Sequence, residues 1–153
     1  MKNITYFILA MVLITSSLSA CSQDLKEAQV PAAAKATFKK LHPDANVHEW
    51  DYNKKTKQYE AEFVLKSIKY EAYFMSDGQW VGTERDIMKA DLPQEVLAGL
   101  AKTEYAAWEI DDIEEHQSPE HKLFYEIEVE QGKQEVYLYF LPDGKLIRTE
   151  KKK

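Results

Sequence analysis

The sequence predicts an α+β fold, a tandem repeat of one unit made of a helix followed by an antiparallel β-meander. Three observations predict this fold. The stretch YFMSDGQW at residues 73–80 recurs as YFLPDGKL at residues 139–146. In each half an apolar residue and a proline, Val30 with Pro31 and Leu92 with Pro93, precede a segment with helical spacing. The segments that follow alternate apolar and polar residues, as strands with one buried face do.

Residues 1–20 have the pattern of a lipoprotein signal peptide. Lys2 gives a positive start, and the apolar run that follows it is too short for a lasting membrane span. Residues 18–21, Leu-Ser-Ala-Cys, resemble the bacterial lipobox, in which cleavage precedes the cysteine and its thiol receives lipid. We therefore predict Cys21 as the lipid attachment site. The alternative is an ordinary signal peptide that is cut after Ala20.

The cysteine count agrees with lipid attachment. Cys21 is the only cysteine, so an exported chain has no internal disulfide to form, and a lipid removes an exposed thiol. We expect residues 21–29 to be an N-terminal tether. The protein is then an exported lipoprotein of the outer membrane of a Gram-negative bacterium, facing the periplasm or the cell surface, and it touches the membrane through its N-terminal lipid only.

Each predicted helix begins at its proline, where the missing N–H group is not needed. The first is expected to end at His42 and Pro43, and apolar spacing places one group of side chains on the sheet-facing side of each helix. In the first helix these residues are Ala33, Ala36, Thr37, Phe38 and Leu41, and in the second they are Val96, Leu97, Leu100 and Ala101.

Alternation and turn residues set the register of the strands. A two-residue turn at Lys66 and Ser67 pairs Leu65 with Ile68, and a Gly132 turn does the same in the second half. The two Asp-Gly turns then launch last strands over 79–84 and 145–149, and further strands are expected near 47–52 and 110–114. The apolar side chains that share the helix-facing side are Tyr59, Ala61, Phe63, Leu65, Ile68, Tyr70, Ala72 and Phe74, and then Tyr125, Ile127, Val129, Val136, Leu138 and Phe140.

These patterns divide the chain into repeat 1 at residues 30–88 and repeat 2 at residues 89–153. A unit of about 60 residues buries little apolar surface alone. The two repeats are therefore expected to pack together or to continue one sheet, with the helices on one face.

The repeated unit resembles the PepSY-like domain of secreted Bacteroidota proteins, also described as β-lactamase-inhibitor-like (BLIP-like). The resemblance covers nearly all of the chain after the leader, although Thr103, Glu104 and Tyr105 replace the usual helix ending in the second copy. It implies a non-enzymatic cell-envelope domain, and tandem relatives, the β-lactamase inhibitors, offer a concave sheet to a target enzyme. The residues that carry it are Val30, Pro31, Phe38, His42, Pro43, Asp44, Ala45, Glu49, Trp50, residues 59–63, Phe74, Asp77 and Gly78.

Composition and motifs exclude several function classes. The chain has 26 acidic and 20 basic residues, a net charge of −6, which disfavours nucleic acid as a partner. It contains no nucleophile elbow, phosphate loop, HExxH or CxxC motif, so we predict no enzyme and no cofactor. His116 and His121, with nearby glutamates, are the best metal candidates, but Pro119 favours a solvated loop between strands, and we predict no metal site.

The sheet face opposite the helices is predicted to carry a protein-binding surface. Tyrosine and tryptophan are frequent in binding hot spots, whereas a solvated sheet face rarely collects large apolar groups. Met75 is expected to face Trp80 across the first Asp-Gly turn, and Leu141 to face Leu146 across the second. The candidate residues are Glu71, Tyr73, Met75, Trp80, Tyr137, Tyr139 and Leu141. Alternatively, these aromatic groups only stabilise the sheet, or the two units cover each other's faces.

The sequence therefore favours a lipid-anchored, non-catalytic binding protein of the cell envelope. Its aromatic and acidic sheet face would bind an unknown protein partner. The most specific form of this hypothesis is that the protein inhibits or modulates a peptidase or hydrolase. The alternative is a periplasmic module that senses a small ligand or a metal through the His116 to His121 segment or a cleft between the units.

Overall fold

The computed structural model describes residues 23–152, so the predicted signal peptide and Cys21 lie outside the described residues. The described chain forms one antiparallel sheet, whose strands lie in sequence order from β1 to β9, and two α-helices. The elements are β1 (Asp24–Leu25), η2 (Glu27–Gln29), α1 (Ala32–Leu41), β2 (Val47–Asn53), β3 (Gln58–Leu65), β4 (Ile68–Phe74), β5 (Trp80–Asp86), η3 (Lys89–Asp91), α2 (Gln94–Leu100), β6 (Glu109–Gln117), β7 (Phe124–Gln131), β8 (Gln134–Phe140) and β9 (Leu146–Lys151).

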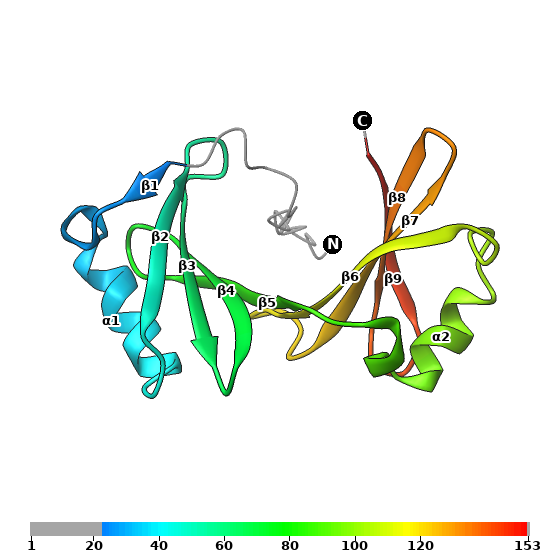
Figure 1. Ribbon diagram of the computed structural model, residues 1–153, viewed down its shortest axis with the longest axis horizontal. Helices are drawn as coiled ribbons and strands as arrows, with labels where there is room; N and C mark the ends of the chain where they lie inside the picture. The colour runs from blue at the N-terminus through cyan, green and yellow to red at the C-terminus, as the bar shows by residue number, and fades with distance from the viewer. Residues whose placement is uncertain (1–22, 153) are drawn as a thin grey trace, which may run out of the picture.

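The two repeats share a single sheet. Strand β5 of the first repeat pairs with β6 of the second, with Glu84 opposite His116. Figure 1 shows the sheet bending at this junction, so that its two ends rise on the same side, while α1 and α2 lie on the outer side. The α+β tandem fold predicted from the sequence is confirmed, and of its two alternatives the continuous sheet with helices on one face is the one observed.

The first core lies between α1 and strands β2 to β4. Phe38 of α1 makes edge contacts with the rings of Phe63, at 5.1 Å, and Trp50, at 6.0 Å. Of the eight strand positions predicted for this side, seven belong to this core or pack against it, including Phe63 and Phe74, whereas Ile68 is 37% exposed. The predicted helix face is partly wrong: α1 buries Ala34 and Phe38, whereas Ala33 and Ala36 are exposed and Leu41, the last residue of the helix, is 43% exposed.

The second core lies between α2 and strands β6 to β8. Val96 and Leu100 of α2 are buried against the helix-facing side chains of these strands. All six strand residues predicted for this side belong to the core, namely Tyr125, Ile127, Val129, Val136, Leu138 and Phe140. Burial of a large apolar side chain contributes about 1.5–3 kcal/mol. The protein thus has two separate cores under one sheet.

The Asp-Gly turns are one residue longer than the sequence suggested. A bulge follows Tyr73 and another follows Tyr139, so Phe74 pairs with Trp80 and Phe140 with Leu146. The predictions that Met75 faces Trp80 and that Leu141 faces Leu146 are therefore wrong. Because each bulge adds one residue to the last strand of its repeat, Trp80 and Leu146 lie on the opposite side of the sheet from the one expected.

Trp80 consequently lies on the helix-facing side of the sheet. It packs against the first core, and its indole Nε1 donates a hydrogen bond to Thr83 Oγ1 at 3.0 Å.

The repeated glycines of these turns are explained by contact with the helices. Gly78 and Gly144 have φ angles of +87° and +79°, a region that favours glycine. A Cβ atom on Gly78 would lie 2.8 Å from the carbonyl oxygen of Ala33 in α1, and one on Gly144 would lie 2.0 Å from that of Glu95 in α2. Each Asp-Gly turn thus places its backbone directly against the helix of its own repeat.

Two further observations concern the ends of the described chain. The segment expected to be a tether contains β1, in which Asp24 pairs with Asp51 and Leu25 with Trp50. Within residues 23–152, neither helix is long and apolar enough to span a membrane.

The turn-to-helix contact predicts a difference between two glycine-to-alanine substitutions. Gly144→Ala should lower the free energy of unfolding by roughly 3 kcal/mol or more, because it combines a left-handed backbone with a clash against Glu95. The control, Gly132→Ala, has a φ of +67° but no atom within 4 Å of the new Cβ. It should lose only about 1–2 kcal/mol. Urea unfolding measures both, and equal losses would contradict the contact.

Candidate functional site

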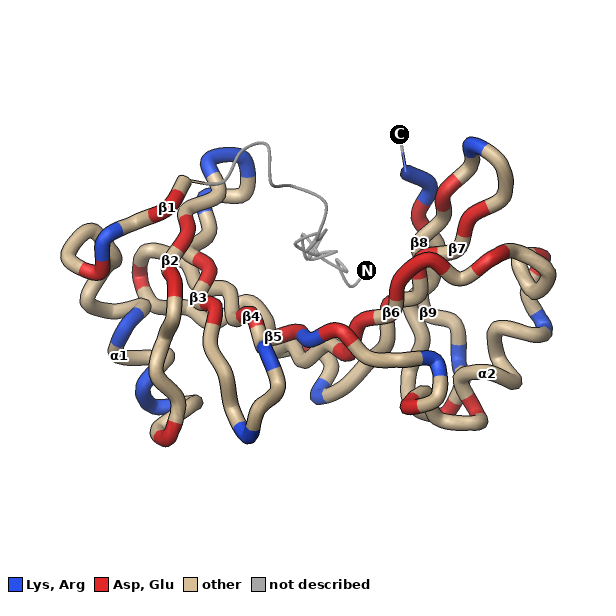
Figure 2. Tube along the Cα trace, viewed as in Figure 1, with Lys and Arg blue, Asp and Glu red and all other residues tan. Residues whose placement is uncertain are grey.

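The sheet side opposite the helices, which we call the concave face, is lined with carboxylates. At every strand junction from β1 to β7, two acidic residues of this face lie directly opposite each other, and Figure 2 shows the acidic positions following one strand after another. Like charges opposite each other destabilise a sheet. A surface selected for stability alone would not have this arrangement. The pairs are Asp24 with Asp51, Asp51 with Glu60, Glu62 with Glu71, Glu71 with Glu84, Asp86 with Glu114, and Glu114 with Glu126.

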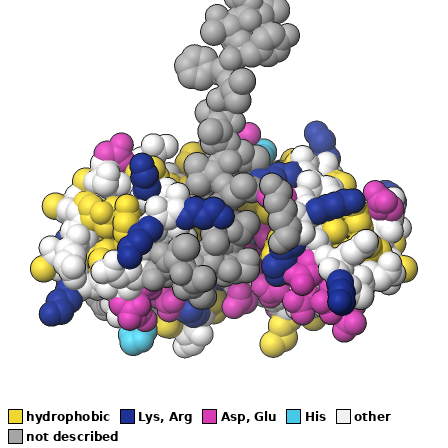
Figure 3. All heavy atoms as spheres, turned by 90° about the horizontal axis from the view of Figure 1, so that it is seen from above, with side chains coloured by type: hydrophobic (Ala, Val, Ile, Leu, Met, Phe, Trp, Pro, Cys, Tyr) yellow, Lys and Arg dark blue, Asp and Glu magenta, His cyan; other side chains and the backbone are white. Residues whose placement is uncertain are grey.

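Two lysines, Lys69 of β4 and Lys152 after β9, compensate some of the carboxylates of the concave face. Lys69 Nζ lies 3.0 Å from Glu62 and 3.1 Å from Glu71, and Lys152 Nζ lies 3.1 Å from Glu128. Seen from above, acidic side chains gather along one long edge of the molecule (Figure 3).

Glu60 shows the electrostatic consequence of this crowding. Burial, followed by the charges of Glu71 and Asp51, raises the pKa of Glu60 to about 8.

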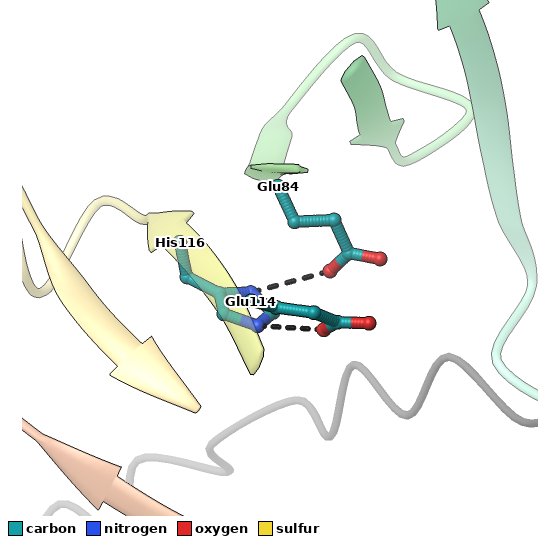
Figure 4. A group of neighbouring side chains, drawn as sticks. All are labelled: Glu84, Glu114 and His116. Atoms are coloured by element: carbon teal, nitrogen blue, oxygen red, sulfur yellow. Dashed lines mark ion pairs between the residues drawn. The ribbon is translucent and has the colours of Figure 1, made fainter. Parts of the chain in front are cut away.

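His116 stands at the centre of this face, where the two repeats join. Its Nδ1 lies 3.2 Å from Glu84, and its Nε2 lies 2.9 Å from Glu114 and 3.5 Å from Glu126. Figure 4 shows the ring between the side chains of Glu84, from β5, and Glu114, from the same strand as His116. The ring also stacks on Phe124 at 4.8 Å. One imidazole thus contacts three carboxylates from three strands.

Burial and neighbouring carboxylates shift the pKa of His116 in opposite directions. Burial by itself would lower the pKa of His116, but Glu114 and Glu84 raise it to about 10. Burial raises the pKa of Glu126 to about 8 and also raises that of Glu84. The cluster therefore retains protons at neutral pH, and it holds a cationic imidazole ring between carboxylates.

Tyr73 connects this centre to the first repeat. Its hydroxyl lies 2.6 Å from Glu84 and 2.9 Å from Glu71. A tyrosine has one hydroxyl hydrogen, so it donates to one of these two carboxylates at a time. Burial, followed by the charge of Glu84, raises the pKa of Tyr73 well above its usual value.

The other predicted tyrosines form a small cluster in the second repeat. Tyr137 and Tyr139 pack with Phe124 and with half-buried Leu141. Arg148 lies over the ring of Tyr139, at 4.6 Å from its centroid.

The expectation of an exposed aromatic centre is wrong for the tyrosines. Tyr73 is 7% exposed, and Tyr137 and Tyr139 are each 3% exposed. Their alternation with the helix-facing residues is as predicted, but their rings are packed among neighbours and the carboxylates of the same face.

The structure thus brings most predicted binding residues onto the concave face, in two groups. Glu71 and Tyr73 lie in the first repeat, and Tyr137, Tyr139 and Leu141 in the second. Met75 lies beyond the bulge, in the Asp-Gly turn, and Trp80 belongs to the opposite side of the sheet. Binding by these residues stays a prediction.

The location of His116 corrects the prediction of a solvated loop. His116 lies in β6 and is buried, whereas His121 follows the strand, its carbonyl oxygen accepting a hydrogen bond from the Ser118 amide. Pro119 does lie in a loop, but β6 continues to Gln117 before that loop begins, so His116 is part of the strand. Alternation of Glu114 and His116 was the available signal. Their partner Glu84 could be found only from the pairing of β5 with β6.

The raised pKa of Glu60 predicts how stability depends on pH. Between the usual carboxyl pKa of 4.5 and about 8, the folded state binds a proton that the unfolded state has lost. Stability should therefore fall as the pH rises through this window. Glu60→Gln, which cannot ionise, should flatten the profile and melt at a higher temperature than wild type at pH 8.5.

Thermal unfolding between pH 5 and pH 8.5, in the presence of EDTA, measures this effect. Glu104→Gln is the control because Glu104 is exposed just after α2. A profile of Glu60→Gln that parallels the wild type would contradict the assignment.

Comparison with known proteins agrees with the fold. A family model described as beta-lactamase-inhibitor-like, PepSY-like matches residues 18–66 and 57–148. No curated protein matches the chain. Among solved structures, a BLIP-like protein from Bacteroides fragilis is 27% identical, with a TM-score of 0.70, and the match covers 80% of this chain and 86% of that one.

Two structures of DUF2874 family proteins are also similar. The protein from Bacteroides ovatus is 28% identical with a TM-score of 0.69, and the match covers 80% of this chain and 87% of that one. The protein from Bacteroides uniformis is 25% identical with a TM-score of 0.69, and the match covers 80% of this chain and 89% of that one. Because the family model matches both repeats and most of the sequence, this chain belongs to the PepSY-like, beta-lactamase-inhibitor-like family.

Proposed function

We propose that this protein is a non-catalytic, lipid-anchored binding protein of the cell envelope, and that its concave face takes up a basic surface of another protein. The single observation that carries this proposal is the row of carboxylates opposite each other from β1 to β7. Such pairs destabilise the isolated sheet. Cationic groups of a partner would relieve this repulsion. The stability that the free protein loses to it would then be recovered as binding free energy.

The shape of the sheet supports the same conclusion. The face is continuous across both repeats and curved, with the helices on the other side, so that it can enclose a protruding segment of a partner (Figure 1). Tyr73, Tyr137 and Tyr139 are buried among the carboxylates and hold them in place, whereas half-exposed Met75 and Leu141 offer apolar contact area. Glu71 completes the predicted binding set. Trp80 is left out because it faces the core.

Similarity to a BLIP-like protein favours inhibition or modulation of a hydrolase or peptidase as the specific role. In this role the face occludes the entrance to a partner's active site. The acidic groups accelerate association with a basic partner and fix its orientation, while Met75 and Leu141 supply apolar contact area.

Charge-neutralised variants test the binding face. The chain is immobilised and exposed to detergent-solubilised envelope proteins of the producing bacterium, and the captured protein is identified, purified and titrated by calorimetry. Glu62→Gln/Glu71→Gln should weaken binding at least tenfold, and 0.5 M NaCl should weaken it further, because screening removes the attraction. Glu104→Gln/Glu120→Gln removes the same charge from exposed positions off the concave face and should bind as wild type does.

The inhibitor role is tested with the purified partner. If the partner is a hydrolase, saturating protein should lower its rate of turnover, and the concave-face variant should restore it. A class A β-lactamase with a chromogenic cephalosporin is assayed alongside. Equal binding by both double variants would rule out the concave face as the site.

Lipid anchoring is tested at Cys21, with localisation to the outer membrane as the expected result. Wild type should incorporate an alkyne-labelled fatty acid and partition into the detergent phase, whereas Cys21→Ser should do neither. Membrane fractionation and surface protease accessibility then separate a periplasmic orientation from an exposed one. Label incorporation into Cys21→Ser would contradict the lipobox assignment.

A further inference from the structure

The centre of the concave face has the geometry of a metal site as well as that of an ion-pair cluster. His116 Nε2 lies 2.9 Å from Glu114 Oε2 and 3.5 Å from Glu126 Oε2. Around a tetrahedral ion with ligand distances near 2.0–2.1 Å, neighbouring donor atoms are separated by about 3.3 Å. The two observed separations from Nε2 lie on either side of that value, as expected for donor atoms that share one ion.

The directions of these contacts fit a metal better than hydrogen bonds. His116 Nε2, Glu114 Oε2 and Glu126 Oε2 are buried, yet none of them has a hydrogen-bond partner of acceptable geometry, although their distances are short. An acceptor lies along the N–H axis in a good hydrogen bond. Oxygen ligands of a shared metal lie off that axis instead, because the ion itself occupies it. Their side chains are 1%, 5% and 4% exposed, so bulk solvent does not reach these atoms.

The remaining contacts hold the imidazole in a ligand's orientation. Its other nitrogen, Nδ1, lies 3.2 Å from Glu84 Oε2, although this contact too is not aligned as a hydrogen bond, and Glu84 Oε1 accepts a hydrogen bond from Tyr73 at 2.6 Å. Metal-bound histidines usually donate their second N–H to a carboxylate, which fixes the tautomer and the ring. Stacking on Phe124, with an interplanar angle of 10°, fixes the plane as well.

We propose that His116 Nε2, Glu114 and Glu126 bind a divalent transition-metal ion of the zinc type, with Glu84 positioning the imidazole ring. A divalent ion also offsets the repulsion between Glu114 and Glu126, which are direct cross-strand neighbours. One imidazole with two carboxylates suits zinc, whereas calcium and magnesium prefer oxygen ligands only. This site differs from the sequence expectation of no metal, and it does not depend on the proposed protein partner.

Calorimetric titration with zinc chloride tests the site. The tag-free chain without residues 1–21 is used, since it keeps every described element and has no thiol that competes for zinc. We expect one zinc ion per chain, with calcium and magnesium binding at least ~100-fold more weakly. Glu126→Gln and His116→Gln should each weaken zinc binding at least tenfold, and Glu84→Gln should weaken it roughly 10–100-fold, as positioning groups do. His121→Gln is the matched control and should bind as wild type does.

A measurement on the unaltered side chains guards against variants that fail to fold. In the nuclear magnetic resonance spectrum of histidine nitrogens, zinc should shift Nε2 of His116 while Nδ1 keeps its proton, and the signals of His48 and His121 should stay in place. Absence of zinc binding at 1 mM would overturn the proposal. Equal affinity for zinc and calcium, or a zinc shift at His48 or His121 without one at His116, would do the same.

Discussion

The pairing of β5 with β6 is the constraint on which the rest of the structure depends. It joins two repeats that each have their own helix and core, and it does so with an antiparallel register that puts Glu84 opposite His116. Because the pairing continues the alternation of both halves, the two helices cover the same side. The opposite side becomes one uninterrupted surface. On the helix-facing side of this junction, Arg85 Nε donates a hydrogen bond to the carboxylate of Glu115, which lies opposite it in the pairing, at 2.8 Å.

This arrangement places the apolar cores and the crowded carboxylates on opposite sides of the sheet. The helix-facing side contains the two apolar cores, and it is where Phe63, Phe74 and Phe140 are fully buried. The concave face collects the charges that oppose folding, with carboxylates opposite carboxylates. A small domain has little stability to lose. The two cores must therefore contribute enough stability to offset the repulsion between the paired carboxylates of the concave face.

Much of the fold could be predicted because the decisive signals are local. The turn at Lys66 and Ser67, with φ angles of 52° and 67°, fixes the β3–β4 register within a few residues. The errors arose where local patterns give no information. A bulge beside each Asp-Gly turn shifted Trp80 to the core side. The cluster around His116 combines β5, β6 and β7 across the repeat boundary, and no alternation within one strand reveals which residue of another repeat lies opposite.

The burial of His116 has a consequence for what kind of ligand the concave face can accept. A buried imidazolium beside three carboxylates leaves the group with an excess of negative charge, which the raised pKa of Glu126, about 8, moderates by retaining a proton. Any cation that enters, whether a metal ion or a lysine or arginine of a partner, competes with that proton and not with water alone. Arg148 and Lys152, which already lie over the rings of Tyr139 and Tyr137, show that this face can place cationic groups on its tyrosines. The proposed binding of cations of either kind thus depends on the same carboxylates that weaken the free sheet.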